Sequence, residues 1–180
     1  MVQKKHWFNL LVLALLAAAM AACGPGATPA PTAPTTYDDP FAYCAAVGNI
    51  DEADTRYVGE KVPQTLAEAL KTASGASADA PLDMFLNGSA WRCMDGKVYG
   101  CVIGANIPCW SKADANRTPS EGSVQFCKEQ PNAEGIPAFA TGRETVYSWR
   151  CKEGMPEVVE QVLQVDARGY QADFWYPLNP

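Results

Sequence analysis

The sequence predicts an α+β fold in which short helices come first and a mainly antiparallel sheet with one inserted helix follows. Helical spacing of apolar residues is concentrated before residue 88, whereas alternating segments separated by turn residues dominate after it. Residues 37–180 also contain six cysteines, an even number that is typical of a disulfide framework. We therefore expect one α+β domain stapled by disulfides.

The helical part begins with a capping signal. Asp39 suits an N-cap, Pro40 the first helical position, and Gly48 the end of a helix over 41–47. A second helix is predicted over 63–73, where apolar residues recur at helical spacing. Residues 74–80 read as a loop, and 81–87 fit either a helix or a loop.

The strongest hairpin signal lies within 89–104. The pair Asp95-Gly96 favours a type I′ turn, which places Cys93 opposite Val98 and Trp91 opposite Gly100. Since side chains alternate between the faces of a strand, Cys93 and Cys101 then lie on opposite faces. These two cysteines are not expected to pair.

Further elements follow the hairpin. Thr118-Pro119-Ser120-Glu121 resembles a capping box and predicts a helix that carries Val124 and Cys127. Residues 145–152 alternate, with Tyr147, Trp149 and Cys151 on one face. Two more strands are predicted over 158–165 and 170–176, joined by a turn at 166–169.

The pattern W-R-C-x-acid-G occurs twice, at 91–96 and 149–154. We interpret Trp and Cys as core and acid-Gly as a turn; the alternative is a surface where Arg92 and Arg150 bind an anion side by side. Six cysteines allow 15 pairings. One hypothesis joins Cys109 to Cys127; another, based on the repeat, joins Cys93 to Cys151 and leaves Cys44 for Cys101.

The first 23 residues carry an export signal. Lys4 and Lys5 precede an apolar run over 10–22, and Met20-Ala21-Ala22 leads into Cys23. This segment resembles a bacterial lipoprotein signal with its lipobox, although Met20 stands where that family usually has Leu. The resemblance implies cleavage before Cys23, fatty acylation of that cysteine with chains such as palmitate, and membrane attachment. The alternative is an ordinary secretory signal.

The predicted organisation is therefore a signal peptide over 1–22, the acylated Cys23 with a Pro/Ala/Thr-rich linker over 23–36, and one globular domain over 37–180. The linker sequence GPGATPAPTAPTT contains four prolines and favours an extended spacer of roughly 40 Å. The domain is expected in the bacterial cell envelope, facing the periplasm or the exterior.

Composition narrows the possible functions. Removal of Lys4 and Lys5 leaves 12 basic residues against 20 acidic ones, a net charge of −8, which argues against nucleic acid as a partner. The single histidine, His6, lies in the signal, so the mature chain lacks the histidine of Ser-His-Asp and Cys-His nucleophile systems. It also lacks histidine ligands for metals, and no Cys-x-x-Cys pair is present. No cofactor or metal is expected.

Three functions remain open. The first is an envelope-tethered binding or structural module for a protein or glycan, with Trp110 and Trp175 as contact residues because aromatic side chains dominate interface energies. The second is a glycan hydrolase that uses two carboxylates. Its candidate acids are Asp95, Asp114, Glu121, Glu144 and Glu153. The third is an inhibitor of an exogenous hydrolase, acting through a loop closed by Cys109 and Cys127.

The series WRCMDGKVYGC, GANIPC, RTPS, FC and VYSWRC resembles an uncharacterised family of bacterial exported domains with cysteines. The resemblance covers most of 43–176. It implies no activity and transfers no functional residue to this chain.

Overall fold

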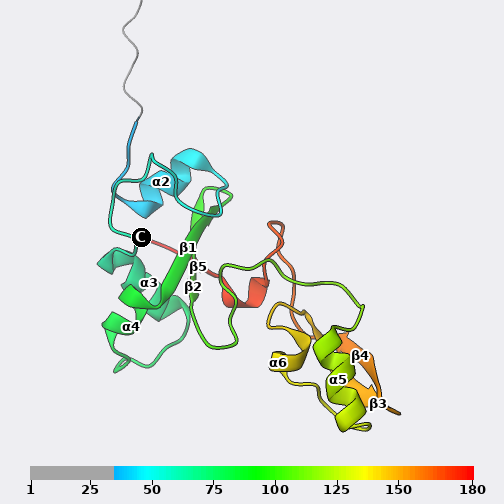
Figure 1. The fold of residues 1–180 in the computed structure, drawn as a ribbon. Coiled ribbons are helices and arrows are strands. Elements are labelled where there is room, and N and C mark those ends of the chain that lie inside the picture. The colour runs from blue at the N-terminus through cyan, green and yellow to red at the C-terminus, as the bar shows by residue number, and fades with distance from the viewer. Residues whose placement is uncertain (1–34) are drawn as a thin grey trace, which may run out of the picture. The chain divides into compact units, whose positions relative to one another are not determined.

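The computed structural model describes residues 35–180, which form one unit. The predicted signal peptide, Cys23 and residues 24–34 of the predicted linker lie outside the described residues. Helices come first and antiparallel strands follow, so the α+β prediction is confirmed (Figure 1). Within 35–180, no helix has the length and apolar character needed to cross a membrane.

Three short helices open the domain: α2 (Pro40–Val47), α3 (Gln64–Ala73) and α4 (Leu82–Asn87). The Asp39 carboxylate accepts hydrogen bonds from the N–H groups of Phe41 and Ala42, and the chain leaves α2 at Gly48 with φ +77°. The first two helices lie where the sequence predicted them. The ambiguous segment 81–87 is helical because Phe85 is buried against the same core as α3.

The main sheet has the order β1-β2-β5, formed by β1 (Ser89–Met94), β2 (Lys97–Val102) and β5 (Tyr176–Leu178). Cys93 pairs with Val98 and Trp91 with Gly100, which confirms the predicted register. Asp95 and Gly96 both have positive φ, +52° and +75°, as a type I′ turn requires.

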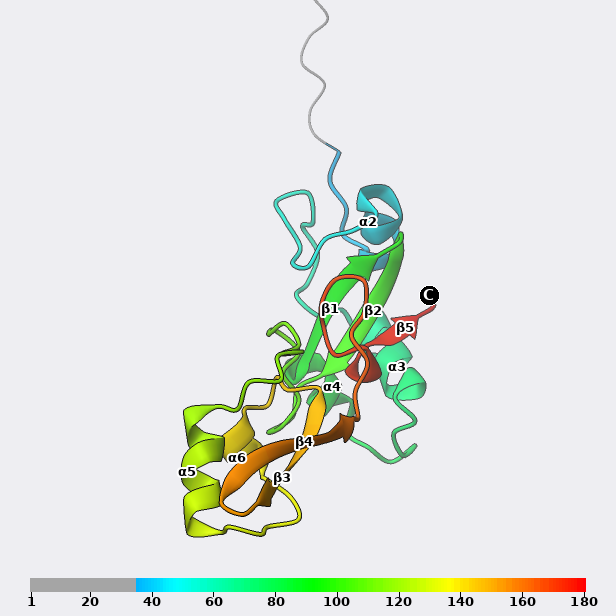
Figure 2. The ribbon, with the colours of Figure 1, turned by 90° about the vertical axis from the view of Figure 1, so that its right-hand side faces the viewer.

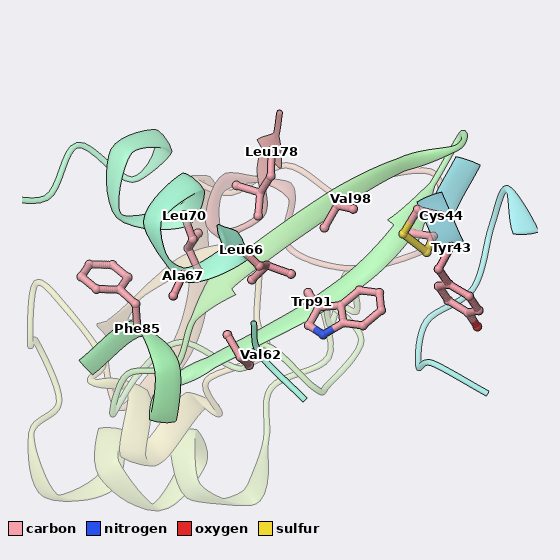
Figure 3. Packing of buried hydrophobic residues seen from close by; sticks show 11 residues of the cluster. Tyr43, Cys44, Val62, Leu66, Ala67, Leu70, Phe85, Trp91, Val98 and Leu178 are labelled. Atoms are coloured by element: carbon pink, nitrogen blue, oxygen red, sulfur yellow. A yellow bond between two sulfur atoms is a disulfide. The ribbon is translucent and has the colours of Figure 1, made fainter. Parts of the chain in front are cut away.

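The two faces of this sheet are covered differently. The helices α2, α3 and α4 cover the face that carries Trp91, Cys93 and Val98, and the main core lies between them (Figure 3). On the opposite face, Ala90 and Cys101 pack against Cys109 and the C-terminal residues Tyr170 and Trp175.

The predicted strand over 170–176 is wrong. The chain instead forms a short 3₁₀ helix, η2 (Ala172–Phe174), before β5. Tyr170 and Trp175 are five residues apart, yet their rings pack edge to face with centroids 5.6 Å apart. An extended strand would point them to opposite faces, so η2 is the bend that brings both rings onto one face of the sheet.

A second cluster contains α5 (Glu121–Glu129), α6 (Ala138–Thr141), β3 (Tyr147–Lys152) and β4 (Met155–Gln161); the hairpin of β3 and β4 lies beside α5 (Figure 2). The capping-box prediction was misplaced, because Ser120 rather than Thr118 caps α5 and accepts the Ser123 N–H. The predicted strand over 158–165 begins earlier, at Met155. Glu153 and Gly154 have φ +51° and +81° and turn the chain as tightly as Asp95-Gly96 does.

Three disulfides are present: Cys44–Cys93, Cys101–Cys109 and Cys127–Cys151. Both pairing hypotheses, Cys109–Cys127 and Cys93–Cys151 with Cys44–Cys101, are therefore wrong. The two W-R-C motifs lie in separate sheets, where each cysteine meets a helix of its own cluster. The prediction that Cys93 and Cys101 do not pair is confirmed.

Candidate functional site

A groove runs along the outer edge of β1. It has a volume of about 480 Å³ and lies between this strand, the segment 52–62 and the side chain of Trp110. An adjoining hollow of about 390 Å³ shares four lining residues with the groove, so that the two form one depression. The shared residues are Lys61, Val62, Ser89 and Trp110.

Aromatic packing positions the wall formed by 52–62. The rings of Tyr57 and Trp91 meet edge to face with centroids 5.0 Å apart, and Tyr43 contacts both. The Trp91 indole N–H donates to the Lys61 carbonyl at 2.6 Å, and the Tyr57 hydroxyl donates to the Glu60 carbonyl at 2.8 Å. Since the first bond ties the segment to β1 and the second holds the segment's own turn, the wall is pre-formed.

The disulfide Cys101–Cys109 positions the opposite wall. It anchors the residue before Trp110 to β2, while the indole itself is 49% exposed. Large aromatic side chains in soluble domains are usually more buried than this. Trp110 is therefore an aromatic surface held in place beside the groove.

The floor contains a polar atom without a partner. Ser89 is buried, and among the described residues its hydroxyl finds no hydrogen bond. A buried hydroxyl without a partner costs about 1–3 kcal/mol. A ligand group that bonded Ser89 Oγ would remove this cost.

The tyrosine of the groove keeps its proton. Burial, followed by the carboxylates of Asp39, Glu60 and Asp38, raises the pKa of Tyr57 to about 12. Tyr57 is therefore a neutral hydroxyl at any physiological pH. The carboxylates of Glu52 and Glu60 and the ammonium of Lys61 are the charged groups around the rim.

The other sequence candidates lie elsewhere. Trp175 is only 7% exposed and belongs to the core, so it is not a surface contact residue. Arg92 is buried and paired with Asp166, and its guanidinium packs against the rings of both Tyr170 and Trp175, at 4.2 Å from each centroid. Arg150 pairs with Glu157 in the other sheet. The structure does not bring Arg92 and Arg150 together on one surface.

The candidate acids do not gather at the groove. Asp95 and Glu153 occupy the turns of two different hairpins, and Glu121 begins α5. Asp114 accepts the Asn116 N–H in a local turn, next to the backbone of Glu144. None of these five lines the groove. No group of three His, Cys, Asp or Glu side chains within 35–180 is placed to hold a metal ion.

The loop proposed for an inhibitor is built differently from the prediction. Cys109 bonds to Cys101 rather than Cys127, so no disulfide closes 110–125. Sequence reasoning selected Trp110 but missed Ser89, Tyr57 and Lys61. Only their assembly around the edge of β1 reveals them, because no local motif marks any of the three.

Comparisons with known proteins do not add to this geometry. No protein-family model matches the chain, and neither a curated protein nor a solved structure matches it.

Proposed function

We propose that this protein is a lipid-anchored binding or structural module of the bacterial cell envelope that faces the periplasm or the exterior. Its partner, a protein or a glycan, occupies the groove beside Trp110. The observation that carries the proposal is this half-exposed indole, held by a disulfide over a groove whose floor contains the unpartnered Ser89 hydroxyl.

The proposed location in the cell envelope is supported by the N-terminal sequence and by the cysteines. The apolar run ending at Cys23 fits a lipoprotein signal, and the proline-rich segment after it fits a spacer. All six cysteines of the domain are in disulfides, a state typical of compartments outside the cytoplasm. Acyl chains at Cys23 would supply membrane attachment, since each buried methylene contributes about 0.8 kcal/mol.

Binding rather than catalysis follows from the chemistry of the groove. Its walls present the rings of Tyr57, Trp91 and Trp110, while Lys61, Ser89 and Glu52 supply a few polar groups. A groove that combines aromatic rings with a few polar groups is the usual form of a ligand site. The Tyr57 hydroxyl is already engaged with the Glu60 carbonyl, so its role there is packing.

The anchor is tested by the intact mass of the protein purified from its native membrane. We expect the mass of a chain that begins at an acylated Cys23, with a gain of six hydrogens when the three disulfides are reduced. A mass without acyl chains would refute the lipid anchor.

The groove is tested by photocrosslinking in living cells. A photoreactive amino acid replaces Trp110 in one strain and Phe139 in another; Phe139 is 85% exposed and packs against Phe126 of the second cluster. We expect a discrete adduct from position 110 alone. Equal adducts from both positions, or none from 110, would contradict a binding role for the groove.

A further inference from the structure

The edge of β1 inside the groove carries unpaired main-chain groups. Cys93 exchanges two hydrogen bonds with Ile50, N–H to carbonyl at 2.9 and 3.1 Å, on the side of β1 that faces away from β2. In an antiparallel pair, residues two apart direct their N–H and C=O to the same side. The main-chain groups of Trp91 and Ser89 therefore also face away from β2.

Nothing in the described residues pairs with those groups. Ile50 covers the edge only at Cys93, and β1 is one of the two edge strands of its sheet. Beyond Ile50 the chain leaves the edge, and the groove begins there, lined by Ser89, Ala90 and Trp91. All three residues are buried. Main-chain N–H and C=O groups at such depth are normally paired, so this edge lacks a strand.

We propose that the groove accepts an extended peptide segment of a partner protein, which adds to β1 as an antiparallel strand and continues the pairing that Ile50 begins. This inference rests on the proposed function and specifies its ligand. The peptide main chain bonds Trp91 and Ser89, which gives affinity independent of sequence, as in other proteins that bind by strand addition.

The side walls determine which peptide fits. In a strand, alternate side chains point to the same face, so one residue of the peptide meets the rings of Trp110, Trp91 and Tyr57. An apolar or aromatic side chain suits this position, and a hydroxyl or amide group two residues along the peptide, on the same face, can satisfy Ser89 Oγ. Glycans lack the alternating N–H and C=O groups that the edge of β1 requires.

The test starts from the full-length protein in detergent, with its disulfides intact, and a displayed library of linear heptapeptides. The tightest heptapeptide is synthesised, and its affinity is measured by fluorescence anisotropy for the wild type, Trp110→Ala and Phe139→Ala. We expect Trp110→Ala to weaken binding at least tenfold and Phe139→Ala to leave it unchanged.

A second measurement separates the contribution of main-chain hydrogen bonds from that of the side chains. The heptapeptide is methylated at one backbone nitrogen at a time, which removes a donor and leaves every side chain in place. Strand addition predicts an alternating pattern, in which every second methylation weakens binding at least tenfold and those between change it less than twofold. Peptide binding should also slow amide hydrogen exchange of Ser89 and Trp91.

The outcomes separate this inference from the proposed function. Methylation effects that do not alternate, or unchanged exchange at Ser89 and Trp91, would overturn strand addition. Binding of cell-wall oligosaccharides, lost in Trp110→Ala, without any Trp110-dependent heptapeptide would also overturn it, yet the groove would remain a binding site. If neither a heptapeptide nor an oligosaccharide binds in a Trp110-dependent way, and crosslinking from positions 110 and 139 is equal, then strand addition and the proposed binding role of the groove are both overturned.

Discussion

Replacing Asp166 by Asn should destabilise the domain strongly, because it leaves the Arg92 guanidinium buried without a counter-ion. Arg92 is 1% exposed, and its pairing with Asp166 links β1 to the C-terminal segment. Removing one member of a buried ion pair costs about 3–5 kcal/mol. Tyr170 and Trp175 still stack on the cation, so we expect the lower end, about 3 kcal/mol. The melting temperature of a domain this size should then fall by about 6–12 °C.

The second W-R-C motif supplies a matched control. Arg150 occupies the same place in its hairpin as Arg92, yet its side chain and that of Glu157 are 42% and 41% exposed. Exposed ion pairs contribute little to stability. Glu157→Gln should therefore leave the melting temperature close to that of the wild type. Replacing both Arg92 and Asp166 by apolar residues should recover much of the loss from Asp166→Asn, because no charge remains buried.

The effect should also depend on pH. Burial raises the pKa of Asp166, but hydrogen bonds from the Tyr170 N–H and from Arg92 outweigh it, so the pKa lies below the ordinary 3.8. Because the pKa of Asp166 is lower in the folded protein, the unfolded chain binds this proton first as the pH falls. The contribution of ionised Asp166 to the free energy of unfolding is therefore full above about pH 5 and is lost as the pH falls below 3.8. The difference between wild type and Asp166→Asn, measured by denaturant unfolding, should shrink over that window. A loss under about 1 kcal/mol at pH 7, or one equal to that of Glu157→Gln, would refute the reasoning.

Three further predictions concern two tryptophans, the disulfides and a glycine in β2. Trp175→Ala should cost about 3–5 kcal/mol in unfolding free energy, whereas Trp110→Ala should change it by less than about 0.5 kcal/mol; denaturant titration compares them, and similar losses would contradict the assignment of Trp110 to the surface. Non-reducing peptide mapping should recover the three disulfides. Replacing a pair by Ala should cost about 4 kcal/mol for Cys44–Cys93, about 3.5 kcal/mol for Cys127–Cys151 and about 2.5 kcal/mol for Cys101–Cys109, because their separations are 49, 24 and 8 residues. A peptide joining Cys109 to Cys127 would refute this framework. Gly100→Ala should cost about 1–3 kcal/mol, because the added Cβ would lie 3.0 Å from Leu70 and Leu178 methyl groups. A melting temperature equal to that of the wild type would contradict this prediction, because it would mean that the core accommodates the extra methyl group.

Local signals in the sequence determined the first two helices and the first hairpin. Asp39 and Pro40 set the start of α2, and Asp95-Gly96 alone fixes the turn and register of β1 with β2, because a two-residue type I′ loop admits one pairing. The acidic net charge, the single histidine at position 6 and the apolar run that ends at Cys23 likewise need no structure, since they are properties of composition and order.

Only the tertiary structure decided which cysteines pair, how deeply each tryptophan lies and where a ligand could bind. The motifs around Arg92 and Arg150 are nearly identical in sequence, yet one arginine is buried against two aromatic rings and the other is half exposed. The difference comes from the segment that returns over the first sheet: Tyr170 and Trp175 cover Arg92, whereas Arg150 and its partner Glu157 stay half exposed on their hairpin. The groove has the same origin, because it exists only where the chain after Ile50 leaves the edge of β1.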